Sequence, residues 1–294
     1  MISAAAAGTW KLGDLTVNRM GFGAMRLTGS AAFDLGTPSS RERSIAVLRR
    51  AVELGVNHID TAAFYFSRLR SANELISRAL APYPDDLVIA TKVGPGRDPS
   101  GEWLPFARPD QLRGQVEENL RQLGRDHLDL VYLRQPGLDS IADHFGALAE
   151  LREAGLVRHL GISNVRPEHL DQAQAIAPVV SVQNQYGVGS TRSRELLRAC
   201  GERGVAFVPF YAIAGKGRDL GASDTDQAEV HAVARAHGVT PAQVRLAWTL
   251  RHGPHVLAIP GTGDPDHLAE NVAAAALRLT DEEAARLDAV TDAG

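Results

Sequence analysis

Cysteine is almost missing from this sequence of 294 residues. Cys200 stands alone, which excludes an internal disulfide bond and a metal site built from several cysteines. A chain without disulfides fits a reducing compartment, so we expect the protein to be cytoplasmic. Lysine is scarce as well. Of the 31 basic residues, three are lysines, namely Lys11, Lys92 and Lys216, and each is therefore a candidate for a special role.

Long hydrophobic runs and blocks of like charge are also missing. No stretch reaches the roughly 18 apolar residues of a membrane-spanning helix, and the first residues lack the basic and apolar regions of a secretory signal. The net charge of −4 argues against a nucleic-acid partner, which needs a concentrated basic face. With 44% hydrophobic and 22% charged residues, the composition is typical of a globular enzyme. We expect a small-molecule partner, and no pattern specifies an oligomeric state.

Short apolar runs recur along the chain, and each is followed by an amphipathic segment. Such runs, rich in valine, isoleucine and leucine, are typical of buried parallel strands. Eight of them are found, at residues 20–24, 58–62, 87–93, 128–133, 160–163, 179–184, 205–210 and 256–260.

The segments between these runs have the period of helices. Residues 41–54 place Ile45, Leu48 and Val52 on one face, with arginine and glutamate opposite. Gly55 then stands where a glycine commonly ends a helix. Similar patterns follow the other runs, so strand and helix signals alternate eight times.

This alternation predicts an α/β protein folded as a (β/α)8 TIM barrel, with residues 1–294 in one domain. A β-hairpin over residues 9–17 precedes the barrel, and a capped helix over residues 280–290 follows it. Two long loops, 94–108 and 212–225, follow predicted strands. In a barrel both lie on the face that carries active sites.

Two charged residues end neighbouring predicted strands. Asp60 ends the second strand and Lys92 the third, so both lie at one level of the barrel. A lone charge at a strand end is common, but a buried ammonium group requires a partner, and the carboxylate supplies one. Tyr65 follows on the loop that leaves the second strand. An ammonium group stabilises the phenolate form of a nearby tyrosine, which suits that tyrosine to donate a proton at neutral pH.

Two glycine-containing segments are candidates for phosphate binding. Residues 21–23 read Gly-Phe-Gly, which lacks the third glycine of a dinucleotide fingerprint and is better explained as a turn. Residues 259–266 leave the last predicted strand and open a helix, whose N–H groups we expect to be available for an anion. A plain capped turn is an equally good interpretation of this second segment.

The sequence resembles the aldo-keto reductase family in several motifs that span nearly the whole chain in order. Those of the second and third strands are Asp60-Thr61-Ala62-x-x-Tyr65 and Ala90-Thr91-Lys92. The later motifs are Gly155 to Asn164, Gln183-Asn184-Gln185-Tyr186, Ile259-Pro260-Gly261-Thr262 and Glu270-Asn271. Details of residues 21–27 and 103–105 are most similar to bacterial reductases of the pyridoxal reductase type.

The resemblance implies reduction of an aldehyde or ketone by NADPH, with NADH also allowed. Tyr65 would be the general acid, Lys92 would assist it, and Asp60 would hold Lys92. The family's fourth catalytic residue is a histidine, where this chain has Arg134. A guanidinium group cannot release a proton near pH 7, but it can donate hydrogen bonds to a developing oxyanion.

The resemblance also assigns a cofactor site. The nicotinamide would contact Ser163, Asn164, Gln183 and Phe210, and the remaining assigned residues are Gly23, Ala24, Met25, Ile213, Gly215, Lys216, Gly261, Thr262, Gly263, His267, Glu270 and Asn271. Asp264 lies where many relatives present serine or a basic residue to the 2′-phosphate, which weakens the expected preference for NADPH. In the loops, Phe66 and Trp103 are candidates for the walls of a substrate pocket.

Two other interpretations are a metal site and a function without catalysis. The histidines have no His-x-x-x-His spacing, so we expect no metal site. A different class of function, a cofactor-binding regulatory or interaction protein with weak or lost reductase activity, is left open by the arginine at position 134. The intact Asp60, Tyr65 and Lys92 argue against it.

Overall fold

Seven parallel strands form a curved sheet in the computed structural model, which describes residues 2–29, 36–213 and 228–292. The strands follow chain order around the sheet, as successive strand–helix units require. They are β3 (Phe22–Gly23), β4 (His58–Asp60), β5 (Val88–Val93), β6 (Leu128–Arg134), β7 (Val157–Ser163), β8 (Val179–Gln185) and β9 (Ala206–Phe210).

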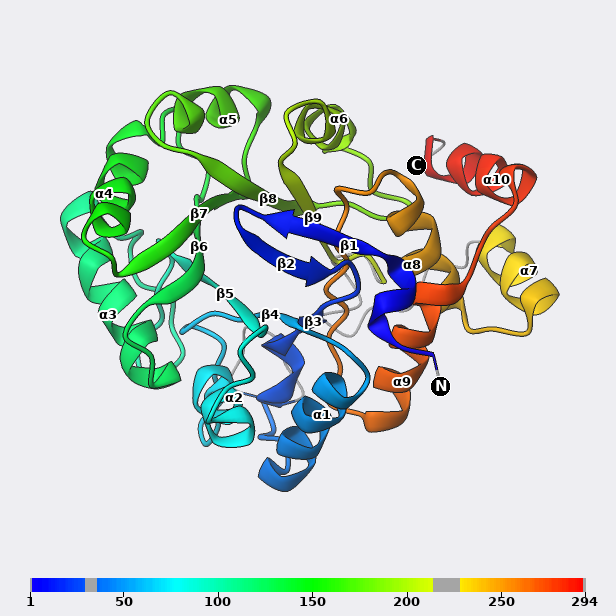
Figure 1. The fold of residues 1–294 in the computed structure, drawn as a ribbon, viewed down its shortest axis with the longest axis horizontal. Helices are drawn as coiled ribbons and strands as arrows, with labels where there is room; N and C mark the ends of the chain where they lie inside the picture. The colour runs from blue at the N-terminus through cyan, green and yellow to red at the C-terminus, as the bar shows by residue number, and fades with distance from the viewer. Residues whose placement is uncertain (1, 30–35, 214–227, 293–294) are drawn as a thin grey trace.

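Helices surround the outer face of this sheet (Figure 1). Each turns an apolar stripe inward, as Val47, Leu48 and Ala51 do in the first helix. The helices are α1 (Arg41–Glu53), α2 (Ala72–Leu80), α3 (Leu112–Leu123), α4 (Ala142–Glu153), α5 (Pro167–Gln174), α6 (Arg194–Glu202), α7 (Ala228–His237), α8 (Pro241–Arg251), α9 (Pro265–Ala273) and α10 (Asp281–Asp292). Short 3-10 helices are η1 (Ala4–Ala7), η2 (Ala24–Leu27), η3 (Pro109–Gln111) and η5 (Ala274–Ala276).

The eighth predicted strand is not a regular strand in the structure. Residues 255–260, which we call the seam, bond to both edges of the sheet at isolated positions. On one side the Gly21 N–H donates to the Ala258 carbonyl at 2.8 Å, and on the other the Leu257 N–H donates to the Phe207 carbonyl at 2.9 Å. Because β3 is only two residues long and Pro260 has no N–H to donate, no ladder extends along this contact. The seam nevertheless joins β9 to β3 and closes the barrel.

One arginine stabilises the seam. Arg19 donates to the carbonyl oxygens of Ala7 at 3.0 Å, Gly253 at 2.6 Å and Val256 at 3.1 Å, and also to that of Leu250. Ala7 belongs to the N-terminal segment, and the other acceptors lie in the last turn of α8, in the turn after it and in the seam. Carbonyl groups that would otherwise lie unpaired between elements are thereby satisfied.

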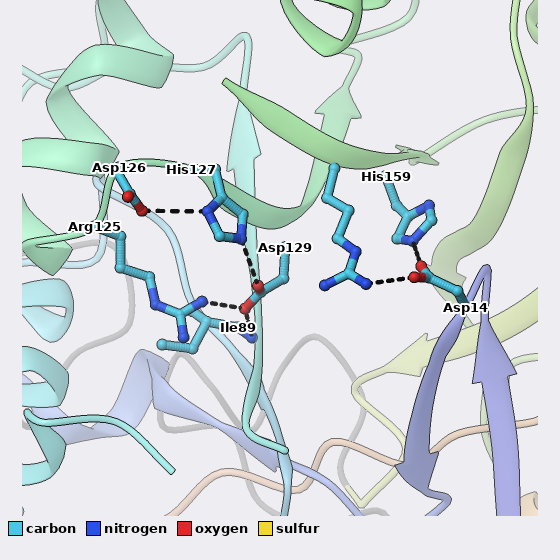
Figure 2. Close-up of polar contacts among 8 residues, drawn as sticks. Asp14, Ile89, Arg125, Asp126, His127, Asp129 and His159 are labelled. Carbon is cyan, nitrogen blue, oxygen red and sulfur yellow. Dashed lines mark hydrogen bonds and ion pairs between the residues drawn. The ribbon is translucent and has the colours of Figure 1, made fainter. Parts of the chain in front are cut away.

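The predicted hairpin is confirmed as β1 (Thr9–Leu12) and β2 (Leu15–Asn18), which pair antiparallel around Gly13. It lies across the ring in Figure 1, where Leu12 and Val17 pack against residues inside the barrel. Asp14 at its tip accepts hydrogen bonds from His159 at 2.6 Å and from Arg158, both on β7; Figure 2 shows the contact with His159. The hairpin is therefore fixed at the end of the barrel where the strands begin.

The predicted C-terminal helix is α10, and it is capped as expected. The Thr280 hydroxyl accepts from the Glu283 N–H, and the Glu283 carboxylate accepts from the Thr280 N–H at 2.8 Å. Within the described ranges, no helix combines the length and apolar character needed to cross a membrane.

Candidate active site

A buried ion pair lies at the carboxyl end of the strands. Lys92 Nζ is 2.6 Å from Asp60 Oδ1, and it also donates to the Thr61 carbonyl at 2.9 Å. The other carboxylate oxygen, Oδ2, accepts from Gln183 Nε2 at 2.7 Å. Lys92 and Asp60 are 2% and 3% exposed. Both charges are compensated and hydrogen-bonded, which is the condition for keeping them inside a protein.

Tyr65 lies beside this pair. Its ring centroid is 4.9 Å from Lys92 Nζ, and the residue is 7% exposed. The loop that carries it is fixed by backbone bonds, from the Tyr65 N–H to the Ala62 carbonyl and from the Ala72 N–H to the Tyr65 carbonyl. The structure thus brings together the three residues that the sequence identified from strand ends and a following loop.

Arg97, which no sequence motif singled out, fixes the same loop from the other side. Its Nη1 donates to the carbonyls of Phe64 at 3.3 Å and Phe66 at 3.1 Å, which flank Tyr65. Its Nε donates to Gly101 in the loop after β5. One guanidinium group therefore links the Tyr65 loop to the loop over the neighbouring strand. An arginine in a long loop was the signal, but nothing in the sequence distinguished it from a surface residue.

A second missed feature is a polar network behind the ion pair. Thr61 and Thr91 follow and precede the inward-pointing Asp60 and Lys92, so they face outward. Thr61 donates to Asn73 on α2 at 2.8 Å, Thr91 donates to Asn119 on α3 at 2.6 Å, and the two asparagines bond to each other at 2.9 Å. All four are fully buried. The network ties the ends of β4 and β5 together on the outer face.

Arg134 points into the barrel mouth. It is the last residue of β6, and its Nη1 donates to the Ser163 hydroxyl, at the end of β7, at 3.3 Å. Its guanidinium carbon lies 5.1 Å from the centroid of the Phe210 ring, at the end of β9. The guanidinium group therefore lies in the wall of the barrel mouth and not on the outer surface.

These groups open onto a cavity of about 630 Å³. Its walls contain Asp60, Tyr65 and Arg134, and many residues that the resemblance assigned to the cofactor. Those assigned residues are Gly23, Met25, Gln183, Phe210, Ile213, Gly261, Thr262 and Gly263. Arg26 and Arg43 also line it, and the sequence did not single them out. Three of the described lining residues thus carry guanidinium groups.

Other assigned residues lie elsewhere. Asn164 is exposed with a positive φ of 60°, and its side chain donates to the Gln135 carbonyl at 2.9 Å. His267 and Glu270 are exposed on α9, and Asn271 is buried there. Ala24 and Ser163 are fully buried and do not line the cavity. Gly215 and Lys216 lie outside the described residues.

The glycine-containing turn before α9 differs from expectation. Asp264 is the N-cap of this helix, and its carboxylate accepts from the N–H groups of Asp266 and His267. These bonds, with Arg43 nearby, lower the pKa of Asp264. Two of the N–H groups expected to be available for an anion are therefore already used by the cap. An anion at this end of the cavity would meet Arg43 instead.

The two predicted pocket walls do not line this cavity. Phe66 borders a separate cavity beneath the loop after β5. Trp103 is 48% exposed, and its ring packs 5.7 Å from that of Phe64. Arg97 stacks over both Phe66 and Trp103. Both aromatic side chains thus contact the arginine that fixes the Tyr65 loop.

His58 lies on β4, two residues before Asp60, and is also fully buried. Neither ring nitrogen has a hydrogen-bond partner among the described residues. Burial lowers its pKa to about 4, opposed by Asp60 and reinforced by Lys92. His58 is therefore neutral at pH 7. In the parts of the chain that the structure describes, no group of three or more histidine, cysteine or acidic residues could hold a metal ion.

Comparison with known proteins gives a consistent result. The family model described as "Aldo/keto reductase family" matches residues 19–292. The chain is 41% identical over 293 residues to pyridoxine 4-dehydrogenase of Escherichia coli K12, covering 97% of this chain and 99% of that one. It is 39% identical to an uncharacterised oxidoreductase of Schizosaccharomyces pombe, covering 98% and 91%.

Solved structures agree in fold. A thermostable aldo-keto reductase in complex with the inhibitor epalrestat is 29% identical with a TM-score of 0.79, covering 96% of this chain and 99% of that one. An aldo-keto reductase of Klebsiella pneumoniae in complex with NADPH is 26% identical with a TM-score of 0.75, covering 94% and 92%.

Proposed function

Since the chain belongs to the aldo/keto reductase family, we propose that it is an NADPH-dependent reductase that converts an aldehyde or ketone to an alcohol. Tyr65 donates the proton in this proposal. The observation that carries it is the position of Tyr65, next to the buried pair of Lys92 and Asp60, in the wall of a cavity.

The cavity fits an anionic dinucleotide. Its guanidinium groups are those of Arg26, Arg43 and Arg134, and the one carboxylate among its described lining residues, that of Asp60, is already paired with Lys92. The lining is therefore positively charged, which favours phosphate groups. When bound, the nicotinamide supplies the hydride. The residues proposed to hold the cofactor are Gln183, Phe210, Ile213, Gly261, Thr262 and Gly263, with Arg43 at the phosphate-rich end.

The protein's own groups handle the proton. As the carbonyl carbon becomes tetrahedral, its oxygen becomes an alkoxide, and the Tyr65 hydroxyl gives it a proton. The negative charge left on the phenolate is stabilised by the ammonium group of Lys92, 4.9 Å from the ring. Asp60 keeps that ammonium group in place. Arg134 lines the same cavity and can donate further hydrogen bonds to the substrate.

The choice of first substrate follows the relatives. The protein that is 41% identical over nearly the whole chain is called pyridoxine 4-dehydrogenase. We therefore propose pyridoxal, an aromatic aldehyde, as the first compound to test, within a panel of aldehydes and ketones.

The test measures NADPH consumption with this panel for the wild-type protein and for Tyr65→Phe. This substitution removes the proton donor and keeps the ring, so kcat should fall at least about a hundredfold. Fluorescence titration should show nearly unchanged NADPH affinity. Near-normal turnover by the variant would remove Tyr65 from its proposed role. Cofactor binding without turnover of any carbonyl would instead support a regulatory protein.

A further inference from the structure

Among the residues that the structure describes, Arg134 has no counter-ion in the candidate active site. Its contacts among the described residues are one hydrogen bond to the Ser163 hydroxyl and the face of the Phe210 ring. A guanidinium group carries five N–H donors, so most of them have no acceptor in the described parts of the chain. The residue is half-buried in the cavity wall.

In the described ranges, no carboxylate of the cavity is available to neutralise it. Asp60 is the one acidic residue among the described lining residues, and Lys92 and Gln183 occupy its two oxygens. The acid at the other end of the cavity, Asp264, pairs with Arg43 and caps α9. A half-buried guanidinium group that lacks an anion has lost solvation without gaining a partner, so an incoming anion would bind there favourably.

The position of Arg134 separates it from the expected cofactor phosphates. Arg43 lies on α1 and contacts the turn before α9, whereas Arg134 ends β6, on a strand in the middle of the sheet. Its two contacts among the described residues are Ser163 and Phe210, which the family resemblance assigned to the nicotinamide end of the site. The unpaired cation is therefore at the reacting end of the cavity, where the substrate must lie.

We propose that Arg134 binds an anionic group of the substrate, so that the preferred substrates are carbonyl compounds carrying a carboxylate or phenolate next to the carbonyl. The proposal rests on the proposed reductase function. Arginine matches a carboxylate with two parallel N–H donors, and it matches a phenolate with one. Because its charge does not titrate near neutral pH, this recognition depends on the ionisation of the substrate alone. Pyridoxal carries a ring hydroxyl beside its aldehyde and falls in this class.

A second role for Arg134, hydrogen bonding to the carbonyl oxygen, predicts a different result. An interaction with the carbonyl is shared by every substrate, charged or neutral. Its loss would reduce turnover of all of them equally. Loss of an interaction with an anionic substituent would instead reduce turnover of the charged substrates only.

The experiment compares matched substrates. One pair is benzoylformate and its methyl ester. The other is salicylaldehyde and 2-methoxybenzaldehyde, and this pair is assayed at pH values above and below the pKa of the salicylaldehyde phenol. We expect the wild-type kcat/KM to be at least about tenfold higher for the anion in each pair, the scale of one charge-assisted hydrogen bond. Arg134→Gln should abolish this preference, because kcat/KM should fall at least about tenfold more for each anion than for its neutral partner. Arg134→Lys should restore part of it. Arg108→Gln, which removes an exposed positive charge, should leave it unchanged.

Binding without turnover provides an independent measurement. Benzoate and benzamide differ in charge and little in shape, and neither is reduced. With NADP⁺ present, benzoate should quench the protein fluorescence at lower concentration than benzamide for the wild type, and the two should be equal for Arg134→Gln. Equal wild-type binding and equal kcat/KM within each pair would overturn the proposal. A preference for the carboxylate alone would restrict it to oxo acids. Failure to reduce any carbonyl would contradict the reductase function, while the benzoate measurement would still test the anion site.

Discussion

Gln183 Nε2 donates at 2.7 Å to the Asp60 oxygen that Lys92 does not contact. The carboxylate is therefore held from both sides, by an ammonium group on β5 and by an amide on β8. The sequence assigned Gln183 to the nicotinamide, but in this structure one of its amide hydrogens is used to orient Asp60. The position of Lys92 under the Tyr65 ring depends on that orientation.

The buried pair should dominate local stability. Asp60→Asn leaves the Lys92 ammonium group without its counter-ion, which should lower the free energy of unfolding by about 3–5 kcal/mol. Urea denaturation measures it. The double variant Asp60→Asn/Lys92→Met removes both charges and should be more stable than the single variant. If the single and the double variant lose the same free energy of unfolding, the unpaired charge of Lys92 is not the cause of the loss.

Arg97 should act on Tyr65 from a distance. Arg97→Met removes the donor to the two carbonyls that flank Tyr65, so the loop should move and kcat should fall about tenfold or more, with little change in NADPH affinity. Steady-state kinetics and fluorescence titration separate these effects. Arg108→Met, on the same loop but exposed, is the matched control. Unchanged kcat in Arg97→Met would show that the loop is held by its backbone bonds alone.

Arg43 should favour NADPH over NADH. Arg43→Gln removes the guanidinium group at the expected 2′-phosphate end, so NADPH affinity should fall about tenfold while NADH affinity stays nearly constant. Asp264→Ser keeps a residue that can cap α9 and releases Arg43 from its carboxylate, and it should strengthen NADPH binding. Fluorescence titrations measure the affinity of each variant for NADPH and for NADH. Arg50→Gln, on the same helix, is the control. Equal losses for NADPH and NADH would place Arg43 away from the 2′-phosphate.

His58 should make the fold sensitive to acid. Burial lowers its pKa from 6.5 to about 4. Between these pH values His58 is therefore protonated in the unfolded chain and neutral in the folded protein. Stability is therefore complete above about pH 6.5 and falls as the pH drops toward 4, by about 1.4 kcal/mol per pH unit for one proton. Unfolding free energies of wild type and His58→Asn across this range give the two slopes. Equal slopes would mean that another group causes the acid sensitivity.

The nearness of Asp60, Lys92 and Tyr65 could be predicted because it follows from local rules. The carboxyl ends of parallel strands meet on one face of a barrel, so residues at these ends lie together without knowledge of side-chain packing. The hairpin and the capped C-terminal helix were predictable for the same reason, since turn and cap residues act within a few positions.

Features that depend on contacts distant in sequence could not be predicted. Arg97 reaches the Tyr65 loop only because the chain after β5 folds back over it, and Asn73 meets Asn119 only once α2 and α3 pack together. The seam shows the same limit. Its apolar run has the composition of a strand, but the short β3 and Pro260 restrict it to isolated bonds.

The seam has a consequence for the order of synthesis. Residues 255–260 are the last part of the barrel wall to be made, and two carbonyl groups that Arg19 binds, those of Leu250 and Gly253, are made just before them. Until this segment leaves the ribosome, the nascent chain is an open sheet, and β3 and β9 both have unpaired backbone groups that can pair with other chains. A chain truncated before residue 250 should therefore aggregate rather than form a smaller stable barrel.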